Sequence, residues 1–216
     1  MNTGFTFFQR QPVTALGLMT ALCVSGLLPG CSIPLPQAEA DPTRYYVLSA
    51  STVPAAGAVA TPGPTIHLRQ VELANYARVR PLIVRRGDNE IQFREFARWG
   101  EPLELGIGRV LREELLARGA AGAVLSPGLR AVKVNYDFEL IVRVLACEGE
   151  AGGAVKFRAV WELAGAVAPN TIVARGDFHG PAANWDGKSE ASLAARLSEA
   201  VVALAAEIAG ALPKKG

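Results

Sequence analysis

The chain has 216 residues, of which half are hydrophobic and 19% are charged, and its formal net charge is +2. This length and composition are typical of a folded globular domain with a substantial core, and they exclude a disordered chain. The small net charge argues against a dedicated nucleic-acid-binding protein, which carries a clear basic excess.

An apolar run begins near Val13 and ends in the stretch Leu27-Leu28-Pro29-Gly30-Cys31-Ser32. It has the length of a secretory h-region and is too short, and too broken by glycine and proline, for a membrane span of about 20 apolar residues. A small residue directly before a cysteine, with leucine three positions ahead, resembles the lipobox of bacterial lipoprotein signal peptides. We therefore expect residues 1–30 to be a removed signal peptide and Cys31 to carry the lipid (palmitate) anchor. An uncleaved N-terminal anchor is the alternative.

Residues 31–43 are rich in proline and alanine, and we expect them to form a lipidated tether for a single domain over residues 44–216. Ser32 follows the cysteine directly. Aspartate at that position is the usual signal for retention in the inner membrane, so serine implies delivery to the periplasmic face of the outer membrane.

The remaining cysteines do not allow an internal disulfide, because Cys23 lies in the leader and Cys147 is left alone. Cys147 follows an apolar run and has no histidine nearby in sequence. We therefore interpret it as a small buried hydrophobic residue and not as a reactive nucleophile.

Strand signals dominate the first part of the domain. Arg44–Ser49 has aromatic and β-branched character. Thr65–Leu73 alternates imperfectly, which predicts a strand with a bulge or a register change near Gln70. Pro81–Arg86 and Glu90–Phe93 flank a Gly-Asp-Asn sequence, which is typical of the turn of a hairpin.

A helix is predicted after this hairpin. Pro102 stands at its first position, where a missing N–H costs nothing, and Gly119 suits the position after its last residue. Between them, apolar residues fall at helical spacing on one face: Leu103, Ile107, Val110, Leu111 and Leu115.

The middle of the chain alternates between apolar and polar residues. Residues 132–144 and 155–161 each place their apolar side chains on one parity, and Thr171–Phe178 is a third strand candidate. Short turn sequences separate the three segments. The three segments therefore predict an antiparallel meander with one face exposed to water.

The last predicted element is an amphipathic helix, capped by Asp186 or Ser189 and ended by Gly210 and Pro213. Its apolar residues recur every three or four positions: Leu193, Leu197, Val201, Leu204, Ile208 and Leu212. We expect this face to pack on the sheet, and a partner-binding helix is the alternative. The predicted fold class is α+β, with a mixed, largely antiparallel sheet packed by two main helices.

The sequence holds no recognisable catalytic motif. It has only two histidines, His67 and His179, and lacks a nucleophile elbow, an H-E-x-x-H pair, a phosphate-binding glycine loop and a C-x-x-C pair. Asp177 and His179 could supply two metal ligands, whereas a structural site normally needs four. We therefore expect no enzyme activity, metal or cofactor.

Arginines are concentrated around the predicted hairpin: Arg78, Arg80, Arg85, Arg86, Arg94 and Arg98. Acidic residues accompany them at Asp88, Glu90 and Glu95. Two interpretations stay open. The group is either a solvated, partly self-paired face or a docking surface for an acidic partner or for lipid headgroups.

Three stretches together resemble the ABC-type transport auxiliary lipoproteins, the PqiC/YmbA-like group. They are Tyr45-Tyr46-Val47-Leu48, Arg80-Pro81-Leu82-Ile83-Val84-Arg85 and Phe96-Ala97-Arg98-Trp99-Gly100-Glu101-Pro102-Leu103, in that order and at the family's spacing. Two departures are visible. The spacing from Tyr76 to Arg80-Pro81 is one residue longer than usual, and Gly100 stands where alanine is common.

The resemblance implies a non-enzymatic docking component of an MCE-type ABC lipid transport system that maintains envelope integrity. Its implied partner is an MCE-domain protein of the inner membrane, and ring-like self-association would suit a cap on a tube. A periplasmic lipid-binding carrier is the alternative function.

Five residues are predicted to contact the partner: Arg98, Trp99, Glu101, Arg80 and Arg85. Arginine and tryptophan dominate interface hot spots, which favours Arg98 and Trp99 in particular. The alternative for Trp99 is a structural role, in which its ring closes the core over the start of the helix.

Overall fold

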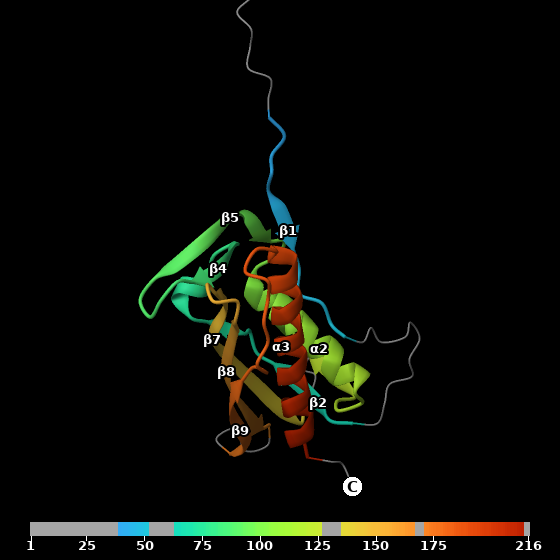
Figure 1. Cartoon of the computed structure of the whole chain (residues 1–216). Helices are drawn as coiled ribbons and strands as arrows, with labels where there is room; N and C mark the ends of the chain where they lie inside the picture. The colour runs from blue at the N-terminus through green and yellow to red at the C-terminus, as the bar shows by residue number, and fades with distance from the viewer. Residues whose placement is uncertain (1–38, 52–62, 127–134, 167–170, 214–216) are drawn as a thin grey trace, which may run out of the picture. The chain divides into compact units, whose positions relative to one another are not determined.

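The computed structural model of the chain (Figure 1) describes residues 39–51, 63–126, 135–166 and 171–213. The predicted leader, Cys31 and most of the predicted tether lie outside the described residues. From Pro42 onward, the described residues form a nine-stranded mixed sheet with two α-helices, α2 (Leu103–Ala117) and α3 (Glu190–Ala211). The predicted α+β class is confirmed.

Strand β7 (Phe138–Glu150) is the centre of the sheet. One of its edges pairs antiparallel with β8 (Val155–Gly165), which in turn pairs antiparallel with β9 (Ile172–His179). This part is the predicted meander. The other edge of β7 pairs in succession with three short parallel strands, β2 (Thr65–Leu68), β3 (Glu72–Leu73) and β4 (Pro81–Arg85).

The predicted hairpin is also present, because β4 pairs antiparallel with β5 (Ile91–Trp99). The last three residues of β5 pair in parallel with β1 (Arg44–Tyr46) at one end of the sheet. At the other end, β2 pairs in parallel with β6 (Ala123–Leu125). A single turn of 3₁₀ helix, η1 (Asn75–Ala77), connects β3 to β4.

The register change predicted near Gln70 is confirmed. Leu68 lies opposite Leu140 of β7 and Glu72 lies opposite Arg143, so four steps along this chain match three steps along β7. The extra residue splits the predicted single strand into β2 and β3, as a bulge does.

Helix α2 begins one residue later than predicted. Pro102 is its N-cap, with a ψ of 130°, which is extended backbone outside the helix. At the other end the prediction holds, because Gly119 has a φ of 64° and donates its N–H to the Leu116 carbonyl at 3.0 Å. That left-handed position after the last turn is one that glycine adopts without steric cost.

Helix α3 is capped by Ser189, whose hydroxyl accepts the Ser192 N–H at 3.2 Å. The other predicted cap, Asp186, accepts the Ser189 N–H at 2.6 Å and so shapes the turn before the helix. The predicted stop at Gly210 is wrong, because the helix continues to Ala211. Leu212 ends it with extended backbone, as expected of a residue directly before proline.

The two helices lie side by side (Figure 1), and α3 also contacts β7 and β8. All six apolar residues predicted for the inner face of α3 are buried, so the packing prediction is confirmed. Cys147 on β7 is only 3% exposed, and burial is the main reason that the pKa of its thiol rises to about 12. A thiol in this state is an inert core side chain, as the sequence predicts.

Candidate interaction surface

Four of the five predicted contact residues come together where β5 ends, next to β1 and the start of α2. Pro81 of β4 lies opposite Arg98 of β5, and the Trp99 N–H donates to the Arg80 carbonyl at 2.7 Å. Glu101 follows in the same turn. Arg85 is the exception, since it lies at the opposite end of β4.

Trp99 lies in the core. Trp99 is 4% exposed and belongs to the same buried cluster as Leu103, the first residue of α2. On the neighbouring strand it lies opposite Tyr46. This burial fits the structural role that the sequence left open for the ring.

Glu101 is engaged inside the domain. Its Oε1 accepts from Arg109 Nη2 at 2.6 Å, and the same nitrogen donates to the Leu48 carbonyl at 2.8 Å. The hydrogen bond to Glu101 is the main reason that the pKa of Arg109 rises. The pair therefore fastens the segment that follows β1 to helix α2.

The same segment is held at two further points. The N–H and the hydroxyl of Ser51 donate to Glu114 Oε1 at 2.6 and 2.7 Å, and the Ser49 N–H donates to the Ser198 hydroxyl at 3.1 Å. Glu114 on α2 is 0% exposed. The chain between β1 and Ser51 is thus fixed to both helices by polar contacts that the sequence analysis missed.

Arg85 pairs with a carboxylate that the sequence analysis also missed. Its Nε and Nη2 donate to the two oxygens of Glu148 at 2.5 and 3.2 Å, and its guanidinium lies 5.8 Å from the centre of the Tyr76 ring. The hydrogen bond to Glu148 raises the pKa of Arg85. Burial, and then the Glu148 charge, raise the pKa of Tyr76. Arg85 therefore supplies the charge and the hydrogen bonds that the buried carboxylate of Glu148 needs.

Arg78, Arg86, Arg94 and Arg98 each have a nearby partner, so the group does not converge on one site. Arg86 donates to the Gln92 side chain at 2.6 Å, and Arg98 Nε donates to the Glu95 carbonyl at 3.0 Å. Arg94 lies 3.8 Å from Glu190. These contacts fit the interpretation of a partly self-paired face.

Exposed apolar side chains gather on β1 and β5. Tyr45 is 60% exposed, Phe96 58%, Val47 54% and Phe93 43%. Tyr45 lies opposite Arg98, two residues after Phe96 on β5. Tyr45, Val47 and Phe96, together with Arg44 and Arg98, are called the β1–β5 surface below.

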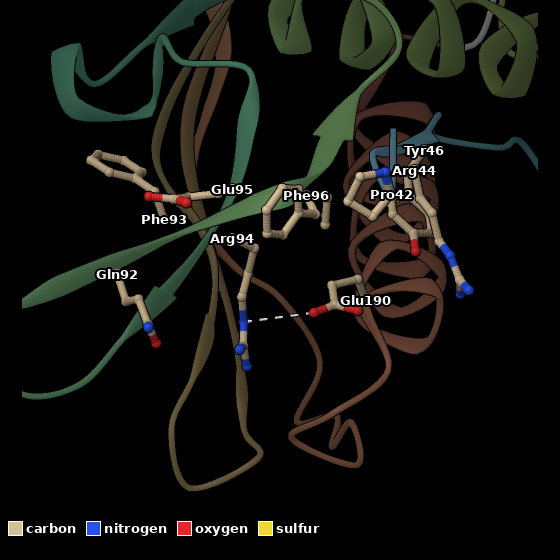
Figure 2. A pocket seen from close by; sticks show the side chains of 10 residues that line it. Pro42, Arg44, Tyr46, Gln92, Phe93, Arg94, Glu95, Phe96 and Glu190 are labelled. Atoms are coloured by element: carbon tan, nitrogen blue, oxygen red, sulfur yellow. Dashed lines mark ion pairs between the residues drawn. The ribbon is translucent and has the colours of Figure 1, made fainter. Parts of the chain in front are cut away.

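A groove of about 410 Å³ adjoins this surface (Figure 2). It lies between Pro42 and Arg44 on one side and the stretch from Gln92 to Ala97 on the other. Figure 2 shows Arg94 extending toward Glu190 at the start of α3, while Phe93 lies on the other side of the β5 ribbon. A second groove of about 440 Å³, mostly apolar, separates Tyr46–Ser51 from Ala191–Val202 of α3.

The remaining candidate chemistry is sparse. His179 Nε2 lies 3.5 Å from Asp177 Oδ1, and Arg158 shares that carboxylate at 3.3 Å. Among the described residues, no three histidine, cysteine or acidic side chains converge as metal ligands would. No helix in the described part of the chain is both long and apolar enough to span a membrane.

Solved structures share this fold. A Xanthomonas campestris protein of the family DUF330 is 18% identical, with a TM-score of 0.63 over 78% of this chain and 93% of its own. An uncharacterized protein is 16% identical, with a TM-score of 0.61 over 78% of this chain and 97% of its own. A PelC dodecamer from Paraburkholderia phytofirmans is 13% identical, with a TM-score of 0.42 over 71% of this chain and 90% of its own. At these identities the likeness to the first two structures establishes the fold alone.

The sequence comparison defines the class further. No curated protein sequence matches the chain. The profile of the ABC-type transport auxiliary lipoprotein component matches residues 46–209, which is nearly all of the described domain. The chain belongs to this family, and is therefore a lipoprotein component of ABC-type transport systems.

Proposed function

We propose that the protein is an outer-membrane lipoprotein, anchored on the periplasmic face through Cys31, that docks an MCE-type ABC lipid transporter and so maintains envelope integrity. The observation that carries this proposal is the family match over residues 46–209, which begins 15 residues after the cysteine of a lipobox-like stretch. The proposed partner is an MCE-domain protein of the inner membrane. Self-association of the domain is part of the proposal.

The anchor has a sufficient physical basis. A buried acyl chain contributes about 0.8 kcal/mol per CH₂, and two chains hold a protein on a membrane stably. No membrane-spanning helix is then needed. In this role the domain supplies a rigid surface, and Trp99, Glu101 and Arg85 support it from within.

The experiment has two arms in the native host. Cys31→Ala is expected to leave a folded protein that is lost from the outer-membrane fraction, while Cys147→Ala stays there as the matched control. After crosslinking, the wild-type chain is expected to co-purify with an MCE-domain protein, and deletion of the gene is expected to sensitise the envelope. Retention of the Cys31→Ala protein in the outer membrane would overturn the anchor. Purification without such a partner would overturn the docking role.

One observation favours a second candidate, a lipid-binding carrier. The groove of about 440 Å³ between Tyr46–Ser51 and α3 exceeds the roughly 300 Å³ that a ligand site needs. It lies outside the packed layer between α3 and the sheet, where Leu197 and Leu204 are at most 1% exposed. Native mass spectrometry that shows no bound lipid after gentle extraction would exclude this function.

A further inference from the structure

We propose that the β1–β5 surface rests on the headgroup layer of a phospholipid bilayer, with its aromatic rings at headgroup depth and its arginines on phosphate groups. This inference rests on the proposed lipid anchor at Cys31 and adds a second, non-covalent membrane contact. It also assigns Arg98 to lipid instead of a protein partner.

The first argument is the length of chain between the anchor and the surface. Eleven residues after Cys31 the chain reaches Pro42, which lines the groove beside Phe96. A fully extended chain of that length spans at most about 40 Å, and an average coil spans about 18 Å. The β1–β5 surface is therefore the part of the domain nearest to the anchor along the chain, and the tether keeps it at a high effective concentration near the bilayer.

The second argument is the composition of the surface. Two exposed aromatic side chains, Tyr45 and Phe96, lie on the adjacent strands β1 and β5, whereas Phe93 lies on the other side of β5. Aromatic rings are enriched at membrane–water interfaces, and an interfacial apolar face enters the headgroup region by about 5–10 Å. In the free domain this apolar area is exposed to water, and contact with a bilayer would remove it from water.

The third argument is charge. With Arg94 paired to Glu190, the other charged side chains on β1 and β5 are Arg44, Arg98 and Glu95, and Arg80 lies next to the end of β5. Glu39 and Asp41 precede them in the chain. A guanidinium binds a phosphate with a planar pair of hydrogen bonds, and phosphate is present in every phospholipid. Arg98 Nε donates to the Glu95 carbonyl at 3.0 Å, which favours one direction of its guanidinium.

The test uses the full lipidated chain in phospholipid vesicles that carry a quencher near the headgroup. A fluorescent label is attached through Glu95→Cys, between Phe93 and Phe96, and in a separate protein through Val173→Cys on β9, which is 43% exposed in the wild type. Cys147 is buried and stays unlabelled in the folded protein. We expect a several-fold larger loss of fluorescence at position 95 than at position 173.

The matched pair of variants separates the surface from the anchor. Tyr45→Ser with Phe96→Ser should restore most of the fluorescence at position 95, whereas Ile172→Ser, which removes a comparably exposed aliphatic side chain on β9, should not. Equal quenching at positions 95 and 173 in a vesicle-bound protein would overturn this inference while leaving the anchor intact. A wild-type protein that does not bind vesicles would overturn the anchor itself. Crosslinks from position 95 to an MCE protein, without quenching, would assign the surface to that protein and refute the bilayer contact.

Discussion

Arg85 and Glu148 form an ion pair in which the acid is completely buried, with Nε and Oε1 2.5 Å apart. Removing one partner of such a pair leaves an uncompensated charge and costs about 3–5 kcal/mol. Arg85→Met should therefore lower the free energy of unfolding by about that amount, as measured by urea denaturation. Arg86→Met is the control, because Arg86 is exposed and its side chain bonds only the Gln92 side chain in the described contacts.

The double variant Arg85→Met with Glu148→Leu gives an independent check. It removes both charges, so it should recover much of the stability that Arg85→Met loses. If Arg85→Met and Arg86→Met had the same small effect, the buried pair would not contribute to stability.

Alkaline pH should weaken the fold through Cys147. Burial, and then the charge of Glu148, raise the pKa of its thiol from 9.0 to about 12. Between pH 9 and pH 12 the thiol ionises in the unfolded chain but stays protonated in the folded protein. The free energy of unfolding therefore keeps its full value below pH 9 and falls as the pH rises toward 12. The loss amounts to at most about 4 kcal/mol.

This effect can be separated from other alkaline titrations by comparing urea unfolding of the wild type and Cys147→Ala across pH 8 to 11. The advantage of the wild type should shrink as the pH rises. Tyr76, whose pKa is also raised, is present in both proteins and cancels. An advantage that is constant with pH would contradict the prediction.

Gly176→Ala should disturb a specific hydrogen bond. Trp161 Nε1 donates to Glu207 Oε1 at 2.8 Å, and a Cβ at position 176 would lie 2.5 Å from that nitrogen and 2.8 Å from that oxygen. Overpacking of this kind costs about 1–3 kcal/mol. We expect lower stability together with altered tryptophan fluorescence. Gly165→Ala on β8 is the control, because its Cβ would meet the nearest atom at 3.9 Å.

Ser189→Ala should cost about 1 kcal/mol, since it removes the side chain that caps α3. Thermal unfolding followed by circular dichroism measures the loss. Ser192→Ala is the matched control, because Ser192 contributes only its backbone N–H to the cap. Equal destabilisation by the two variants would show that the cap is not the cause.

The sequence predicts α3, the hairpin and the meander because their patterns are local. Apolar residues recur every three or four positions on the inner face of α3, and the alternation of apolar and polar residues breaks near Gln70, where the register changes. Helix ends were less accurate. Helix α2 begins after Pro102 and helix α3 continues past Gly210. The backbone angles of single residues set these two helix ends, and the residue type alone does not determine those angles.

The candidate site was harder to predict, because burial depends on distant contacts. Glu114 and Glu148 each bond a partner 63 residues away, and nothing near either acid in the sequence identifies that partner. Trp99 could equally have been a hot spot or a core ring until β1 and α2 were placed around it. Exposed aromatics such as Phe96 stand in strand-like alternation, which does not show which side of the strand is covered.

The position of β7 orders the assembly of the domain. The strands β2, β3 and β4 all precede α2, yet each depends on a strand that begins at Phe138. A nascent chain emerging N-terminus first therefore has the β4–β5 hairpin long before it has the template for its parallel pairings. Contacts of such sequence separation form slowly, because loop closure precedes any gain from pairing. Newly made molecules consequently pass through a period in which the edges of β2, β3 and β4 that pair with β7 are unpaired, and an unpaired edge can pair with another chain.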